Sequence, residues 1–324
     1  MKSKALRNPA LVVLLIALLV IVTEFRLVST SSLLILQYVG IYSLMVLGIN
    51  IVNGYLGIFS LAHAGFMAVG AYSAALMSKY LFTSVWLFPL TLLFGGLSAM
   101  CIGLLVAIPS FKSKGDYLAI ITLGFTLMVQ SILQNVNFIG ASRGMNNIAR
   151  FTDAYWVFGC LLFGILVVTR FIPSKYGRSL KAIREDQAAS ELVSVDVRRV
   201  KTTAFALSAF LIGVSGALLC HLLGYTSPSA YGYTNIVDGL VMVYIGGVGS
   251  ITGSIIGAVI WQFLIQTLKD LGTWRWVVGG VLLCLVMIFL PNGIFGRREL
   301  GQALLQLKQK VAGMLGKGDK ADGR

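Results

Sequence analysis

The feature that most constrains this chain is a series of ten apolar runs separated by short polar breaks. A bilayer-spanning helix needs about 20 apolar residues, and most of the runs approach that length, although the eighth and ninth are shorter. In chain order the runs are Pro9–Phe25, Leu33–Val52, Leu61–Ser78, Trp86–Pro109, Tyr117–Asn135, Trp156–Ile172, Thr202–Leu223, Asn235–Ile245, Ser254–Leu268 and Trp274–Leu290. The pattern predicts an all-α, polytopic transmembrane protein with about ten spans, eight being the alternative count.

The balance of residue types agrees with a membrane protein. Hydrophobic residues make up 57% of the chain and charged residues only 12%, about half the charged share of a soluble domain. A soluble fold needs more polar surface than this to cover its core. We therefore exclude a soluble enzyme, a disordered protein and a nucleic-acid binder, although the net charge is +14.

The positions of the basic residues predict the orientation in the membrane. With the N-terminus in the cytoplasm, 20 of the 26 Lys and Arg residues fall on cytoplasmic segments, most of them in Arg170–Lys201 and in the tail from Arg297. Such a bias predicts cytoplasmic termini and an even number of spans. We expect a transmembrane domain at residues 1–296, with a cytoplasmic loop at 173–200. Residues 297–324 form a basic tail that would lie on anionic membrane lipid.

Two segments interrupt the plain apolar pattern with polar and helix-weakening residues. The first is Asn50–Tyr72 and the second is Gly246–Ala258. Unwound backbone at membrane depth is tolerated only where protein buries it or water reaches it, and transporters place paired broken helices along the substrate path. The candidate pathway residues are Asn50, Gly54, Gly57, Ser60, His63, Gly246, Gly247 and Gly249.

Ordinary packing is the alternative for several of these residues. Glycines at four-residue spacing allow helices to approach closely, and we expect this role for Gly253 and Gly257. His63 lies three residues from Ser60 and would share its helical face, or it is a neutral histidine bonded to a neighbouring helix. Asp238 and His221 are expected near an interface.

The chain lacks a visible energy source of its own. It has no chain of acidic and basic residues within the spans for ion coupling, and no GxxxxGK[ST] phosphate loop. No metal-ligand cluster or catalytic motif is present either, so we predict a non-enzymatic chain that binds no cofactor or metal.

The loop at 173–200 is the longest polar stretch between the apolar runs, and an apolar stripe within it predicts a helix over Ser179–Val193. This helix either lies on the membrane surface or docks in a groove of a cytoplasmic partner. We expect Ile183 to anchor it in that partner, and Lys181 to point outward. The candidate coupling residues are Gly177, Arg178, Leu180, Ile183, Arg184, Glu185, Asp186 and Leu192.

Several motifs are similar to those of a known family. The matching segments are Ser60–Ala64 with Phe66 and Gly70–Tyr72, Asp116–Tyr117 with Thr122–Phe125, Gly177–Arg178 with Ala182–Asp186 and Ala188–Ala189, Gly246–Ser250 with Gly253 and Gly257–Ala258, and Pro291–Gly293. With these segments in order, the chain resembles the LivM-type permeases of branched-chain amino-acid ABC importers. It departs from the family pattern at Ala62, Ile58, Leu127, Gln130, Arg143–Asn147 and Ser194, and Ser194 stands where glycine is common.

The resemblance implies a permease subunit in a bacterial inner membrane that moves branched-chain or related amino acids inward. It also implies a second permease subunit, two cytoplasmic ATPases that use the ATP, and a periplasmic solute-binding protein that sets most of the selectivity. Permeases for urea, short amides or other small solutes share the pattern and remain the alternative. A stand-alone secondary transporter or channel, and an intramembrane enzyme using Ser60 and His63, are the rivals from other classes.

Overall fold

The computed structural model describes residues 30–81, 84–110, 116–268, 272, 274–289 and 293. The first apolar run, Pro9–Phe25, and the basic tail at 297–324 lie outside these residues. The helices are α2 (Thr30–Ile49), the π-helix η1 (Asn50–Tyr55), α3 (His63–Tyr80), α4 (Phe88–Ser110), α5 (Asp116–Asn135), α6 (Ala154–Phe171), α7 (Lys175–Glu185), α8 (Gln187–Leu192), α9 (Val197–Leu223), α10 (Tyr233–Gly246), α11 (Ile251–Thr267) and α12 (Trp274–Phe289). Short 3₁₀ turns lie at Val85–Leu87, Asn137–Ile139, Ala141–Arg143 and Pro228–Tyr231.

The all-helical fold class is confirmed for the described residues. Each predicted run from the second to the tenth coincides with a helix, and the run Tyr117–Asn135 differs from α5 by one residue. Within the described part of the chain, five helical segments are long and apolar enough to cross a membrane: Ser32–Tyr55, Val85–Pro109, Tyr117–Asn135, Ala154–Phe171 and Val197–Leu223. Ile251–Thr267 is a shorter apolar helix.

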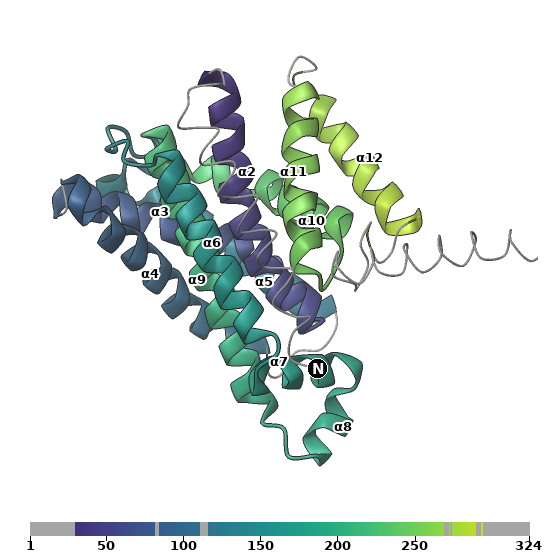
Figure 1. The fold of residues 1–324 in the computed structure, drawn as a ribbon. Coiled ribbons are helices and arrows are strands. Elements are labelled where there is room, and N and C mark those ends of the chain that lie inside the picture. The colour runs from purple at the N-terminus through teal and green to yellow at the C-terminus, as the bar shows by residue number, and fades with distance from the viewer. Residues whose placement is uncertain are drawn as a thin grey trace, which may run out of the picture.

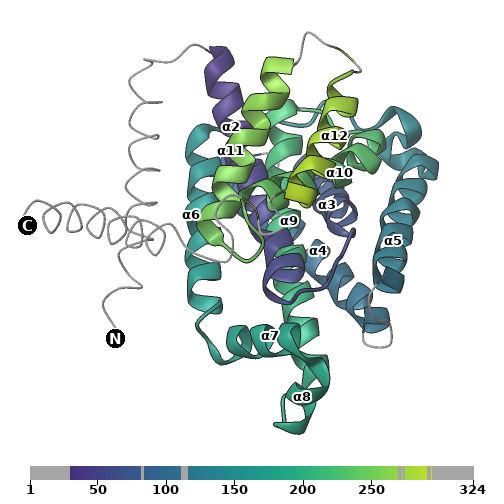
Figure 2. The ribbon, with the colours of Figure 1, turned by 90° about the vertical axis from the view of Figure 1, so that its right-hand side faces the viewer.

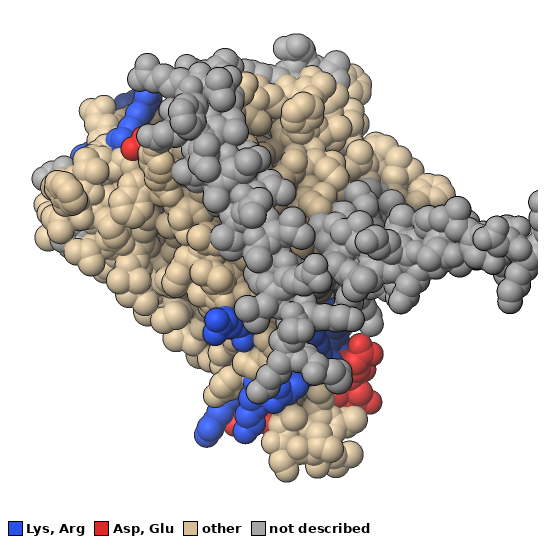
Figure 3. Space-filling model, in the orientation of Figure 1, with Lys and Arg blue, Asp and Glu red and all other residues tan. Residues whose placement is uncertain are grey.

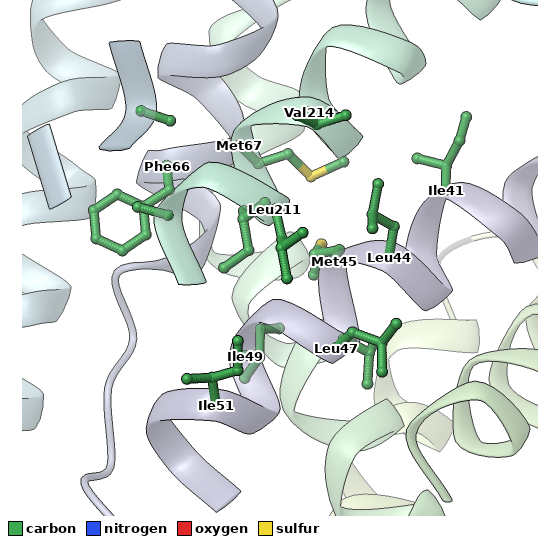
Figure 4. Packing of buried hydrophobic residues seen from close by; sticks show 14 of the residues in the cluster. Ile41, Leu44, Met45, Leu47, Ile49, Ile51, Phe66, Met67, Leu211 and Val214 are labelled. Carbon is green, nitrogen blue, oxygen red and sulfur yellow. The ribbon is translucent and has the colours of Figure 1, made fainter. Parts of the chain in front are cut away.

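Helix α9 forms the centre of the bundle, with α2, α3 and α4 packed around it (Figure 1). Small residues make the close crossings possible. A side chain at Gly213 would press on Ala99 of α4, and one at Gly216 would overlap the backbone of Met67 in α3. Figure 4 shows side chains of α2, α3 and α9 meeting in the core, among them Met45, Met67 and Leu211.

Helices α10, α11 and α12 pack on one another beside α2, while α5 stands at the edge of the bundle (Figure 2). Glycines allow α10 and α11 to approach each other closely. Gly246 of α10 faces Gly253 and Gly257 of α11, and a Cβ on any of the three would overlap backbone of the other helix. The packing role predicted for Gly253 and Gly257 is confirmed, and it extends to Gly246.

Figure 3 shows the larger group of charged side chains at the end formed by α7, α8 and the start of α9, and a smaller group at the opposite, upper left end. The α7–α8 end is built from the segment between α6 and α9, whereas Arg143 and Arg150 lie in the segment before α6. Because α6 separates the two segments by its full length, they lie at opposite ends of the bundle. This arrangement fits the predicted division of the basic residues between the two membrane faces.

The prediction of one helix over Ser179–Val193 is wrong. Asp186 leaves the helical conformation, with φ −155° and ψ 115°, and its carboxylate accepts a hydrogen bond from the Ala189 amide. It therefore ends α7 and caps α8, as aspartate favours at a helix N-terminus. Close packing explains why residue 177 is glycine, because a Cβ at Gly177 would overlap the backbone carbonyls at the end of α6.

Candidate functional site

The first predicted segment contains non-helical backbone, which joins the candidate span Ser32–Tyr55 to α3. Helix α2 continues as the π-helix η1, the chain is non-helical over residues 56–62, and α3 begins at His63. Gly57 adopts φ +74°, a left-handed conformation that glycine accepts at no steric cost. Asn53 closes the loop, because its side chain donates to the Ser60 carbonyl and accepts from the Ser60 amide, each at 3.2 Å.

The second predicted break is confirmed between α10 and α11. The chain is non-helical over residues 247–250, where Gly247 and Gly249 have φ +129° and +89°. Gly246 still belongs to α10, so its assignment to the unwound stretch is wrong. The 14 residues of α10 rise only about 21 Å, less than the ~30 Å hydrocarbon core of a bilayer.

The side chain of Asn50 joins the two breaks, which lie some 200 residues apart in the sequence. Its Oδ1 accepts from the Gly249 amide at 2.7 Å, and its Nδ2 donates to the Ser250 carbonyl at 2.9 Å and to Ser254 Oγ at 2.5 Å. Gly54 lies against this amide, and a Cβ there would overlap Asn50 Oδ1. We call this meeting point of residues 50–57 and 247–254 the glycine junction.

Helix α7 contacts the glycine junction from the charged end of the bundle. Arg184 Nη1 donates to the Gly54 carbonyl at 2.5 Å. The Lys181 ammonium lies 5.7 Å from the centre of the Tyr55 ring, within reach of a cation–π attraction. The Lys181 side chain is nevertheless exposed, on the outward side of α7 as expected.

A small polar cavity lies beside the first break. Its lining includes the polar side chains of Asn53, Ser60, His63 and Ser208, with apolar residues of η1, α3 and α9 completing it. The volume is about that of one water molecule, far less than an amino acid needs. Of the pathway residues predicted for this break, Ser60 and His63 line the cavity, whereas Asn50, Gly54 and Gly57 do not.

His63 and Ser60 do not share a helical face, because α3 begins only at His63. The His63 Nε2–H donates to the Ile236 carbonyl of α10 at 3.1 Å. Ser60 Oγ accepts weakly from the Ala62 amide at 3.4 Å. The alternative in which His63 bonds a neighbouring helix is the one observed, and the pair does not form a nucleophile and its base.

Two threonines of α5 hold the first break, and our sequence reasoning gave them no such role. Thr122 Oγ1 accepts from the Leu61 amide, and Thr126 Oγ1 donates to the Leu61 carbonyl, both at 2.9 Å. Their four-residue spacing places them on one helical face. The spacing indicates a shared polar face on this helix, but it does not indicate which loop the two threonines bind.

The coupling residues separate into a buried and an exposed group. Leu180 and Ile183 are 0% and 6% exposed, because they pack into this chain's own core. They are therefore not free to anchor in a partner. Leu192 and the adjacent Val193 are 88% and 73% exposed. Arg178, Glu185 and Asp186 are also exposed.

The two polar residues expected near a membrane interface, His221 and Asp238, are buried and partly buried within the protein. His221 is fully buried, its Nδ1 is bonded to the Ala217 carbonyl at 2.8 Å, and its ring stacks on Phe151. Asp238 is partly buried and accepts from the Trp261 indole at 3.1 Å. Asp238 therefore joins α10 to α11, whereas His221 bonds within α9 and packs on Phe151 in the segment before α6.

Comparison with known proteins places these features in a family. Residues 31–291 match the model of the branched-chain amino acid transport system permease component. The chain belongs to this family. It is 29% identical to the high-affinity branched-chain amino acid transport system permease protein LivM of Escherichia coli K12, over 95% of this chain and 78% of that protein. It is 30% identical to LivM of Salmonella typhimurium, over 86% and 74%.

Other relatives share less with the chain. The permease protein LivH of Salmonella typhimurium is 26% identical over 80% of this chain and 92% of its own length. The xylose transport system permease protein XylH of Escherichia coli K12 is 32% identical over 39% of this chain. No solved structure matches the chain at a significant level. The family match spans both breaks and the α7–α8 segment, and these relatives are transport permeases rather than enzymes.

Proposed function

We propose that this chain is the transmembrane permease subunit of an ABC importer that carries branched-chain amino acids into the cytoplasm. The observation that carries the proposal is the glycine junction, which lies within the part of the chain that matches a family of transport permeases. Paired broken helices at membrane depth are the device by which transporters expose backbone to a substrate. The small cavity beside the junction then represents a closed state of the pathway.

The proposed topology has ten spans and cytoplasmic termini. The charged end formed by α7 and α8 would face the cytoplasm, and the segment with Arg143 and Arg150 would face the periplasm. The excess of Lys and Arg over the α7–α8 end supports this orientation. The α7–α8 segment would then be the contact for a cytoplasmic ATPase.

The side chains available for that contact are Leu192 and Val193 at the end of α8. Exposed apolar residues on an otherwise charged segment are typical of a docking surface. The buried Ile183 would serve this contact indirectly, because it fixes α7 on the bundle. The complete importer would also contain a second permease subunit, a second ATPase and a periplasmic binding protein, and ATP would be used by the ATPases.

The solute is tested by reconstituting the complete importer in proteoliposomes with ATP and offering labelled leucine, urea and xylose separately. We expect leucine to accumulate and the other two to stay at the level of empty vesicles. Accumulation of urea would assign the chain to the permeases of small amides. Accumulation of xylose alone would contradict the amino-acid assignment.

A further inference from the structure

Arg184 joins a surface helix to the glycine junction through a single side chain. Figure 2 shows α7 directly below the lower end of the α2–η1 segment. From there the partly buried Arg184 reaches the Gly54 carbonyl. Carbonyls in the last turn of a helix have no partner within that helix, so a donor from outside stabilises the end of η1.

The side chain of Arg184 also explains why residues 57 and 249 are glycines. Its Cγ lies 2.5 Å from the position that a Cβ of Gly57 would occupy, and its Nη1 lies 3.2 Å from the corresponding position at Gly249. A side chain at Gly57 would displace the arginine, and one at Gly249 would crowd its guanidinium. Arg184 therefore lies between the two breaks and contacts both of them.

The bonds within the junction extend this contact to both broken segments. The Asn50 amide occupies the space where a Cβ of Gly54 would lie, and it bonds the Gly249 amide and the Ser250 carbonyl. The Arg184 guanidinium, through its bond to Gly54, thus holds the η1 side of the glycine junction, and Asn50 connects that side to residues 249 and 250. A tilt of α7 that carries Arg184 off Gly54 would remove this donor, while Leu180 and Ile183 keep α7 packed on the core.

We propose that Arg184 is a latch that keeps the glycine junction closed, and that it is released when α7 moves. The proposal rests on the proposed transport function, in which the α7–α8 segment meets the ATPase. Ionised donors make stronger hydrogen bonds than neutral ones, so one arginine is sufficient to bias the junction toward the closed arrangement. The latch links the position of α7 to the opening of the polar cavity.

The test measures opening of the cavity directly. Ser60, which is buried and lines the cavity, is changed to cysteine (Ser60→Cys) in a chain whose four native cysteines are replaced by alanine. Labelling by a small thiol reagent is followed in the assembled importer without ATP. Arg184→Met keeps the stem on Gly57 but removes the donor, and Lys175→Ala is the control, because it removes one exposed charge from the same helix.

We expect Arg184→Met to raise the labelling rate about tenfold, the effect of losing roughly 1.4 kcal/mol from one charged hydrogen bond. Lys175→Ala should label at the parental rate. Equal rates for Arg184→Met and the parent would overturn the latch. If Arg184→Met does not assemble, Arg184→Lys replaces it, because the lysine ammonium ends one bond short of the Nη1 position, and the same rise is required. The assay needs no solute, so an error in the assigned solute would leave this result unaffected.

Discussion

Replacing Asn50 by leucine tests whether the glycine junction holds the two breaks together. Asn50→Leu preserves the branched shape of the side chain and removes every hydrogen bond of the amide. The native side chain makes three such bonds, to the Gly249 amide, the Ser250 carbonyl and Ser254 Oγ.

The three losses are unequal, because two of the partners keep other bonds. The Ser250 carbonyl still accepts from the Ser254 amide at 3.1 Å and from Ser254 Oγ at 2.9 Å. The part-buried Gly249 amide is left as a donor without Asn50, at a cost of about 1 kcal/mol, the lower end of the range for an unsatisfied group. Hydrogen bonds between membrane helices average only about 0.6 kcal/mol, so the orphaned amide dominates and we expect a total near 2 kcal/mol.

The free energy of unfolding is measured by titrating the purified permease with a denaturing detergent. Ser254→Ala is the matched control, because it removes one partner of Asn50 and leaves the Gly249 amide bonded. We expect the control to lose less than about 1 kcal/mol and Asn50→Leu to lose about twice as much or more. Equal losses for the two variants would refute the assignment of Gly249 as the critical partner.

Three further predictions concern single substitutions. Gly57→Leu and Gly249→Leu should abolish uptake while the importer still assembles, because both glycines have positive φ. Full uptake by either variant would show that this glycine is dispensable. Ser194 has φ +62°, so Ser194→Gly should raise the free energy of unfolding by about 1 kcal/mol, because the backbone strain is relieved. An unchanged midpoint in the detergent titration would argue against strain. In a cysteine-free chain, an impermeant thiol reagent outside intact cells should label Ser142→Cys but not Leu192→Cys, and the reverse pattern would overturn the proposed orientation.

Local patterns in the sequence predict local features of this protein well. Runs of apolar residues locate α5 and α12 closely, since a membrane helix must satisfy its backbone internally. Clustered glycines locate both breaks, because glycine weakens a helix and accepts positive φ. Even Ser194, where the resembled family commonly has glycine, proves to have the left-handed backbone that glycine favours.

The contacts between distant segments could not be predicted in this way. Nothing near Asn50 in the sequence indicates that it binds Gly249, because that pairing depends on how α2 and α11 pack. The apolar stripe of α7 predicts a buried face, but periodicity does not tell whether this chain or a partner covers it. For Ile183 the cover is this chain's own core. Asp186 was assigned to a continuous helix because its capping role appears only once the backbone turns.

The central claim, that this chain moves solute only as part of an ATP-driven importer, is tested most directly by omitting subunits. Proteoliposomes are prepared with the permease alone, with both permease subunits, and with the ATPases and binding protein added. Uptake of labelled leucine is followed with and without ATP. We expect accumulation only in the complete assembly with ATP. Leucine flux through vesicles that hold this chain alone would contradict the account and indicate a self-sufficient transporter or channel.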